Sequence, residues 1–176
     1  ELAQTYEKAF IPQQFNNIAN PTVHFNTTGP EIWTDTAGEI DLFVAGIGTG
    51  GTMAGVSRYI KTQTDACNFV AVEPLDSAVL SGEEAGPHMI QGIGAGFVPG
   101  NLKDGDFDSI VKVSNDDAMN MSRQLAKDEG LVLGISAGAN VFAAYQEGKK
   151  AENKGKTIVT ILCDFGERYL STALYE

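Results

Sequence analysis

The chain has 176 residues, and its 12 Lys and Arg against 23 Asp and Glu give a formal net charge of −11. A hydrophobic fraction of 43% suits one globular domain with a sizeable core. The acidity argues against nucleic acid or an anionic membrane as a partner, because either would need a basic patch. No apolar run approaches the roughly 18 residues of a membrane span and the opening residues lack a signal-peptide pattern, so a cytoplasmic location is expected.

Apolar runs of strand length alternate along the chain with stretches of helical spacing. The predicted strands cover residues 40–47, 68–74, 109–114, 131–136 and 157–163. Helices are expected at 1–12, between Thr28 and Gly38, and at 52–63, 115–129 and 139–152. This alternation predicts an α/β fold: a three-layer, open, mostly parallel sheet with helices on both faces.

Single residues mark where some of these helices begin and end. Thr28 is placed to cap the helix that contains Pro30, and Ser114 is placed to cap the next long helix, with Asp117 three residues on. Gly130 ends that helix. The stretch 75–105 is rich in Gly, Pro and acidic residues, so it is expected to form loops.

The cysteines and histidines do not form a metal-binding pattern. Cys67 and Cys163 each lie beside a β-type run, without a CxxC spacing, which favours two small free thiols over a disulfide or a metal site. His24 and His88 are also far apart in the chain. We therefore expect no metal ligands.

The glycine-rich segment that follows the first predicted strand, residues 48–52, has the composition of an anion cradle. Gly48, Gly50 and Gly51 allow main-chain N–H groups to turn inward and an anion to approach closely. Thr49 and Thr52 add hydroxyl donors, and the start of the following helix adds partial positive charge. The segment predicts a phosphate site, with a tight turn that binds nothing as the structural alternative.

A second functional interpretation comes from the same glycines. Gly46, Gly48 and Gly51 satisfy the GxGxxG fingerprint of dinucleotide-binding proteins. The next predicted strand carries Glu73, 22 residues after Gly51, where an acid that binds the ribose would lie. The competing hypotheses are therefore a cradle for one phosphate monoester and an NAD site.

Five motifs occur along the chain in a fixed order. They are QQFNN..ANP..H (13–24), VAGIGTGGT (44–52), PHMIQGIGAGF (87–97), GISAGAN (134–140) and GERYLSTAL (166–174). In this order they resemble the cysteine synthases, or O-acetylserine sulfhydrylases, of the fold-type II pyridoxal-phosphate enzymes. The resemblance implies that residues 13–176 are the C-terminal cofactor-binding lobe, and that 1–12 belong to or lead from an N-terminal lobe.

The resemblance implies a cofactor, pyridoxal 5′-phosphate, and a role for individual residues. The GTGGT loop (Gly48, Thr49, Gly50, Gly51 and Thr52) would hold the 5′-phosphate, and Ser136, at the end of a predicted strand, would contact the pyridine nitrogen. Gln14 would help to bind the substrate carboxylate, Gly92 would line the substrate side, and His24 would lie near the site. Tyr169 and Phe97 are expected to serve packing.

The implied activity of the whole protein is synthesis of L-cysteine from O-acetyl-L-serine and sulfide by β-replacement. The implied partners are a second copy, in a homodimer, and serine acetyltransferase. The sequence departs from the family pattern where Cys163 and Phe165 flank Asp164, positions at which proline and a small polar residue are frequent, and where Ala137 replaces a second serine or cysteine.

The family's Schiff-base lysine belongs to the N-terminal half, and none of the nine lysines of this chain fits that role. A lysine of that kind needs a desolvated pocket that lowers its pKa, whereas these lysines fall in solvated clusters, on helix surfaces or in loops. The isolated chain is therefore predicted to be inactive. The alternatives are a non-catalytic module that binds pyridoxal phosphate or a protein partner, and an NAD-binding Rossmann domain.

Overall fold

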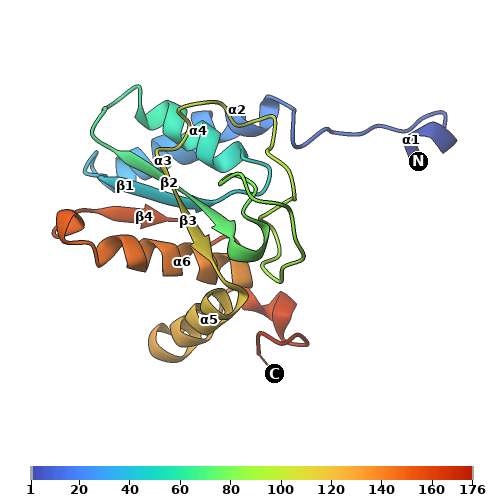
Figure 1. Cartoon of the computed structure of the whole chain (residues 1–176). Coiled ribbons are helices and arrows are strands. Elements are labelled where there is room, and N and C mark those ends of the chain that lie inside the picture. Colours follow the sequence, from blue (N-terminus) through green and yellow to red (C-terminus); the bar gives the residue numbers. More distant parts are fainter. Residues whose placement is uncertain (1, 176) are drawn as a thin grey trace.

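A four-stranded parallel sheet lies at the centre of the molecule (Figure 1). The computed structural model describes residues 2–175. The strands are β1 (Leu42–Gly46), β2 (Asn68–Pro74), β3 (Ser109–Val113) and β4 (Ile158–Thr160), in the spatial order β3-β2-β1-β4. In the centre of the sheet, Val44 of β1 pairs with Val70 of β2 on one side and with Thr160 of β4 on the other. The predicted parallel α/β fold is confirmed.

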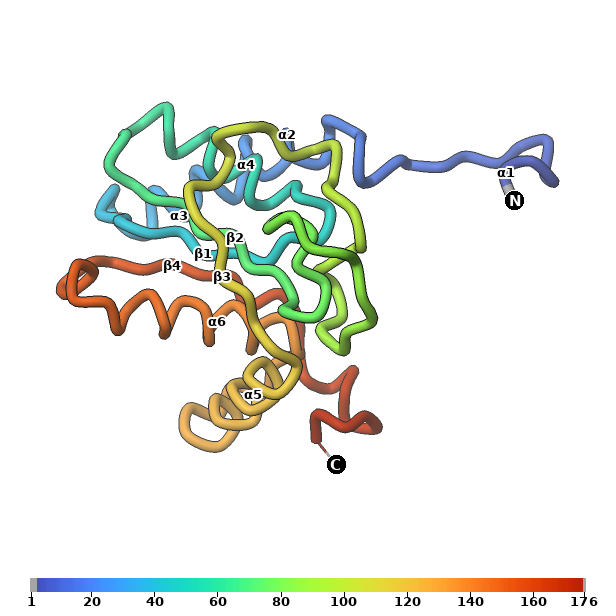
Figure 2. Tube along the Cα trace, in the orientation of Figure 1, coloured from blue at the N-terminus to red at the C-terminus, as the bar shows by residue number. Residues whose placement is uncertain are grey.

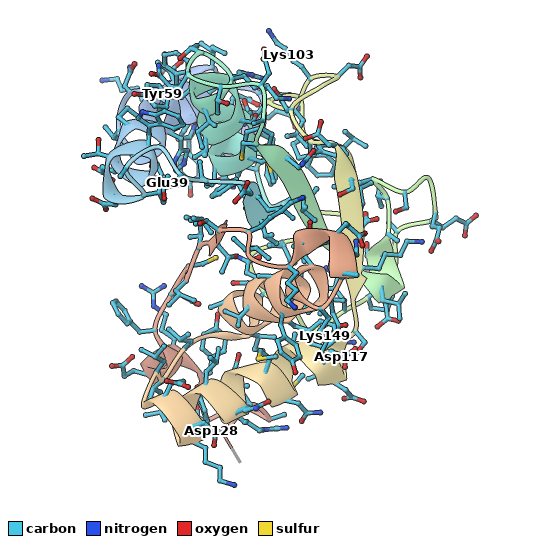
Figure 3. The ribbon with its side chains drawn as sticks, turned by 90° about the vertical axis from the view of Figure 1, so that its left-hand side faces the viewer. Glu39, Tyr59, Lys103, Asp117, Asp128 and Lys149 are labelled. Carbon is cyan, nitrogen blue, oxygen red and sulfur yellow. The ribbon has the colours of Figure 1, made fainter. Side chains whose placement is uncertain are left out.

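Helices cover both faces of this sheet. The helices α2 (Ala19–Asn26), α3 (Thr28–Asp35) and α4 (Gly51–Ile60) lie on one face, and α5 (Asn115–Glu129) and α6 (Ile135–Gly148) lie on the other (Figure 1). Figure 3 shows the same layers from the side, with Tyr59 of α4 on one side of the sheet and Asp117 and Asp128 of α5 on the other. The three-layer arrangement is therefore as predicted.

The two halves of the core follow from the alternation of side chains along the strands. Phe43 and Ala45 of β1 face the α4 side, where they pack with Met53, Val56 and Ile60. On the opposite face, Leu42 and Val44 pack in one cluster with residues of α5 and α6, including Met119, Ile135, Ala139 and Ala143. Because both faces of β1 are covered, its apolar residues run without interruption.

The N-terminal residues form much less helix than the sequence predicts. Within 1–12, helix is found only in α1 (Leu2–Thr5), and Glu1 lies outside the described residues. After α1 the chain forms an extended arm that leads back to the body (Figure 2), and Phe10 is 85% exposed. An isolated helix of about 12 residues is only marginally stable in water unless one face packs against the rest of the protein. This explains why the segment forms less helix than predicted.

The strand predicted at 131–136 is wrong. Leu133 makes only an isolated antiparallel bridge to Phe165, and α6 already begins at Ile135. Ile135 is buried as a helical residue between α6 and the sheet, so its apolar character serves helix packing instead of a strand. The segment predicted at 157–163 is a strand only over Ile158–Thr160, because the Ile161 carbonyl then accepts a hydrogen bond from the Asn140 side chain (2.9 Å).

The ends of the helices follow the sequence signals in part. Ser114 caps α5 by accepting from the Asp117 N–H (3.1 Å), and Gly130 ends it with φ of 71°, as predicted. The predicted cap at Thr28 is wrong, since Thr28 is the first residue of α3 and its hydroxyl bonds to the His24 ring instead. The helix predicted at 139–152 begins four residues earlier, at Ile135, and ends at Gly148.

The rest of residues 2–175 forms loops and three short 3-10 helices. These are η1 (Leu75–Ser77), η2 (Ala151–Asn153) and η3 (Gly166–Tyr169). The loops predicted for 75–105 are confirmed apart from η1. Within residues 2–175, no helix has the length and apolar character needed to cross a membrane.

Candidate functional site

A cavity of about 470 Å³ lies where β1 leads into α4, at the carboxyl end of the parallel sheet. Ligands of open α/β sheets bind at this edge. The lining residues come from four separate segments of the chain: Gly46, Gly48, Thr49, Gly50, Gly51, Thr52, Gln91, Gly92, Ile93, Ser136, Cys163, Asp164, Arg168 and Tyr169. The structure thus brings seven of the nine predicted site residues into one cavity, and Gln14 and His24 lie beside it.

The segment 48–52 needs its glycines to take this shape. Gly50 has φ of 78°, in the left-handed region that residues with a side chain rarely adopt. A Cβ on Gly48 would lie only 2.3 Å from the carbonyl oxygen of Gly92, which also lines the cavity. The main chains of the two glycines therefore meet at a distance that no larger residue at position 48 allows.

The N–H groups of this segment are available to an anion. The hydrogen bonds found within residues 2–175 use none of the N–H groups of Gly48, Thr49, Gly50 and Thr52, and the Gly51 N–H has only a long contact to Thr49 Oγ1 (3.5 Å). The first N–H groups of α4 have no partner inside the helix, and the helix dipole adds partial positive charge at the same end. These groups form a site suited to phosphate.

Ser136 lies in the wall of the same cavity and is 4% exposed. It stands in the first turn of α6, not at the end of a strand as predicted. Cys163 lies beside it, and its sulfur accepts from the Asn140 side-chain amide (3.3 Å). Burial among these neighbours raises the pKa of the Cys163 thiol, although the residue as a whole is exposed.

The two cysteines therefore differ in position. Both are free, as predicted, and Cys67 is buried in the core on the α4 side. Cys163 also lines the cavity, a position that the sequence analysis did not assign to it. The sequence did contain a signal for this position. Cys163 comes just before the GERYLSTAL motif, which is one of the motifs that carry the family resemblance.

Gln14 and Gly92 meet at a second cavity of about 380 Å³. This cavity shares Gly48, Thr49, Gly92 and Ile93 with the first, so the two are neighbours. The Gln14 carbonyl accepts from the side-chain amides of Asn20 (2.9 Å) and Asn101 (2.7 Å). These hydrogen bonds hold the Gln14 main chain beside the loop 48–52.

His24 lies behind the loop and does not line either cavity. Its Nε2 is 3.3 Å from Thr52 Oγ1, and its Nδ1 is 2.9 Å from Thr28 Oγ1. Burial lowers the pKa of His24, so the ring is neutral at pH 7. A neutral ring in this place acts as a support for Thr52.

Asp164, Arg168 and Tyr169 are cavity residues that the sequence analysis did not assign to the site. The Tyr169 hydroxyl donates to Asp164 Oδ2 (2.6 Å), while Asp164 Oδ1 is buried and has no partner among the described residues. Burial, followed by the contact with Asp164, raises the pKa of Tyr169 to about 12. Tyr169 was predicted to serve packing; it is buried, and it also forms part of the cavity wall.

Glu73, which the dinucleotide hypothesis places on a ribose, is turned into the protein. It is 2% exposed. Its carboxylate accepts from the Leu80 N–H (2.8 Å) and from the N–H and hydroxyl of Ser81. Because its acceptors are used by its own loop and it does not line the main cavity, the geometry argues against an NAD site.

Similarity to known proteins agrees with this geometry. The family profile "Pyridoxal-phosphate dependent enzyme" matches residues 1–164. A cysteine synthase of Staphylococcus aureus is 56% identical over 167 residues, which cover 94% of this chain and 54% of that protein. The chain therefore spans about half the length of this relative.

Two solved structures have nearly the same fold over the whole chain. O-acetyl serine sulfhydrylase isoform 3 of Entamoeba histolytica superposes with a TM-score of 0.95 at 47% identity, covering 99% of this chain and 52% of that chain. The O-acetylserine dependent cystathionine beta-synthase of Helicobacter pylori superposes with a TM-score of 0.93 at 39% identity, covering 99% and 56%. The resemblance to cysteine synthases is confirmed, and the chain belongs to the pyridoxal-phosphate dependent enzyme family.

Proposed function

We propose that this chain forms the phosphate- and ring-binding part of a cysteine synthase, which makes L-cysteine from O-acetyl-L-serine and sulfide. The observation that carries the proposal is the single cavity that joins the 48–52 loop to Ser136 and Gly92. The names of these relatives support the substrate, since two of them specify O-acetylserine and one is a cysteine synthase.

The residues present fit pyridoxal 5′-phosphate. A dianionic phosphate matches the unused N–H groups of the loop and the start of α4. Gly48, Gly50 and Gly51 carry no side chains that would fill the cradle, and Gly48 lies directly against the Gly92 carbonyl. Ser136 offers a neutral hydroxyl to a ring nitrogen within the same cavity.

When bound, this cofactor acts as an electron sink at the substrate α-carbon while the β-substituent leaves. Ser136 donates or accepts a single hydrogen bond and carries no negative charge, so it does not hold a proton on the ring nitrogen as an aspartate would. The loop 48–52 would hold the phosphate through its unused N–H groups and so orient the cofactor in the cavity. Gln14 and Gly92 form the neighbouring wall, where a substrate carboxylate would be held.

The chain is proposed to act only together with a further lysine-bearing part. None of the described residues that line the cavity is a lysine. Lys61 donates to the Gly105 carbonyl (2.5 Å), Lys112 pairs with Glu83, and Lys150 pairs with Glu147 (2.7 Å). Lys103 and Lys149 lie on opposite sides of the sheet in Figure 3.

Ligand-dependent thermal unfolding of this chain tests the proposal. Pyridoxal 5′-phosphate is expected to raise the unfolding temperature more than pyridoxal, which lacks the phosphate, and NAD is expected to have no effect. Borohydride reduction of the mixture should leave no adduct at the cavity, because no lysine lines it. Equal protection by pyridoxal and its phosphate would contradict the phosphate site, and protection by NAD would favour the dinucleotide alternative.

The same experiments separate the enzyme proposal from a non-catalytic module. If the full-length gene product forms cysteine from O-acetylserine and sulfide while this chain alone does not, the chain is one part of a synthase. Full-length protein that binds pyridoxal 5′-phosphate without turnover would favour the module. Homodimer formation and a serine acetyltransferase partner are proposed on the family resemblance alone, and a cytoplasmic location is proposed on the sequence pattern.

A further inference from the structure

The side chain of Asn20, on α2, touches two parts of the site at once. Its Nδ2 donates to Thr49 Oγ1 (2.8 Å) and to the Gln14 carbonyl oxygen (2.9 Å). Because a carbonyl oxygen only accepts, the group that faces Gln14 must be the NH₂ and not the amide oxygen. Both amide protons of Asn20 are therefore committed, one to the hydroxyl of the loop and one to the Gln14 main chain.

This orientation determines what the Thr49 hydroxyl can do. A hydroxyl has two lone pairs and one proton. The lone pairs of Thr49 Oγ1 face the Asn20 amide at 2.8 Å and the Gly51 N–H at 3.5 Å. Within residues 2–175 the Thr49 proton has no acceptor, and Thr49 lines the main cavity. The remaining direction for this proton is toward a ligand in the cavity.

Gly51 provides the space that this contact needs. A Cβ on Gly51 would lie 1.8 Å from Asn20 Oδ1, so the Asn20 side chain fits against α4 only because position 51 is glycine. One turn further along both helices, a Cβ on Gly55 would lie 2.5 Å from the His24 Cβ. Residues four apart on α2 thus pack over glycines four apart on α4, which fixes the register of the two helices.

We propose that Asn20 is a positioning residue for the phosphate site, which holds the Thr49 hydroxyl as an acceptor so that its proton is donated to the bound phosphate. The inference rests on the proposed pyridoxal 5′-phosphate site. Asn20 does not line either cavity, so it acts through Thr49 and does not touch the ligand itself.

Asn101 provides a comparison, because it holds the same two segments only by their main chains. Its Nδ2 donates to the Gln14 carbonyl (2.7 Å) and to the Thr49 carbonyl (2.9 Å). It has no contact with the Thr49 hydroxyl. Loss of Asn101 therefore removes support for the loop but leaves the polarity of the hydroxyl unchanged.

The test compares the affinities of this chain and its variants for pyridoxal 5′-phosphate and for pyridoxal, by calorimetric titration. Asn20→Asp keeps the shape of the side chain but only accepts hydrogen bonds, so it turns the Thr49 proton away from the cavity. Asn20→Leu removes both donors without adding a charge. Asn17→Asp is the matched control, since it adds the same charge in the same segment. There the Asn17 Nδ2 donates to the Pro12 carbonyl (3.0 Å) and its Oδ1 accepts from the Ala19 N–H (3.0 Å), and neither contact involves the site.

Both Asn20 variants are expected to bind pyridoxal 5′-phosphate roughly tenfold or more weakly, as for loss of a hydrogen bond to a charged group, with pyridoxal affinity unchanged. Asn17→Asp should bind as the wild type does. In a Thr49→Val background, where the hydroxyl is already absent, Asn20→Leu should cause little further loss. Such non-additivity distinguishes action through Thr49 from general weakening of the loop.

The possible results separate the two proposals. A wild-type chain that does not prefer pyridoxal 5′-phosphate over pyridoxal overturns the phosphate site, and the role of Asn20 with it. A wild-type preference that persists in Asn20→Leu, or an Asn20 effect that adds fully to that of Thr49→Val, overturns only the role of Asn20. If Asn20→Asp fails to fold, the thermal transition shows it, and Asn20→Leu decides.

Discussion

Replacement of Gly48 by alanine tests the close approach on which the cavity depends. A Cβ at position 48 would lie 2.3 Å from the Gly92 carbonyl oxygen, whereas ordinary contacts begin at 3.4 Å. One of the two main chains must therefore move by about 1 Å, and overpacking of this kind costs roughly 1–3 kcal/mol. Both segments line the cavity, so the movement changes the cradle itself.

Gly148→Ala is the matched control, because it adds the same methyl group without a clash. A Cβ there would lie 3.6 Å from Ile158 Cδ1, an ordinary contact, and Gly148 is the last residue of α6. Alanine favours helix over glycine by about 1 kcal/mol or less. This variant is expected to be as stable as the wild type or slightly more so.

Thermal unfolding and titration with pyridoxal 5′-phosphate measure the two effects. For a chain of this size, a loss of 1–3 kcal/mol lowers the unfolding temperature by roughly 2–12 °C. We expect Gly48→Ala to show such a decrease and a loss of affinity of roughly tenfold or more, as a change of about 1.4 kcal/mol in binding would give. An unchanged unfolding temperature together with unchanged affinity would refute the inference that Gly48 and Gly92 meet as tightly as described.

Three further outcomes are expected. Arg58→Met should lower the free energy of unfolding in urea by about 3 kcal/mol, because it removes donors to both oxygens of the buried Asp106 carboxylate (2.9 and 2.7 Å). Lys61→Met, which alters an exposed lysine on the same segment, is the control. Burial lowers the pKa of His24 below 6.5, so as the pH falls the unfolded chain binds a proton at His24 before the folded chain does. The free energy of unfolding should therefore fall below about pH 6.5, and it should fall less in His24→Gln. Urea unfolding at pH 5 and pH 7 measures both effects. Iodoacetamide followed by peptide mass spectrometry should label Cys163 before Cys67, whose buried thiol has a pKa raised to about 12, and pyridoxal 5′-phosphate should slow only the labelling of Cys163. Faster labelling of Cys67 would contradict its burial in the core, and labelling of Cys163 that the ligand does not slow would contradict its place in the cavity.

Local patterns were sufficient to predict most of the framework. The uninterrupted apolar run of β1 reflects burial on both faces, and the spacing of Met53, Val56 and Ile60 reflects the single buried face of α4. Where a short apolar run had more than one use, the pattern failed. Residues 131–136 resemble a strand, but the structure uses Ile135 in the packed face of a helix.

The site was predictable to the extent that its residues lie in motifs. The 48–52 loop, Gly92 and Ser136 were assigned from the sequence, and all of them line one cavity. His24 belongs to a motif as well, yet it lies behind Thr52, and Asp164 was not assigned although it lines the cavity. A motif indicates that a segment is near a site, but it does not indicate which side chains face the ligand.

The sequence by itself therefore determined the α/β class, the place of the glycine loop between β1 and α4, and the residue types suited to phosphate. Only the tertiary structure decided that the Gly92 carbonyl meets Gly48, that Glu73 is used by its own loop, and that the Asn20 amide donates to the Thr49 hydroxyl. The reason is that periodicity and glycine spacing report the local conformation of the chain. The partner of a polar group depends on segments far apart in sequence, and their distance is set only when the layers pack.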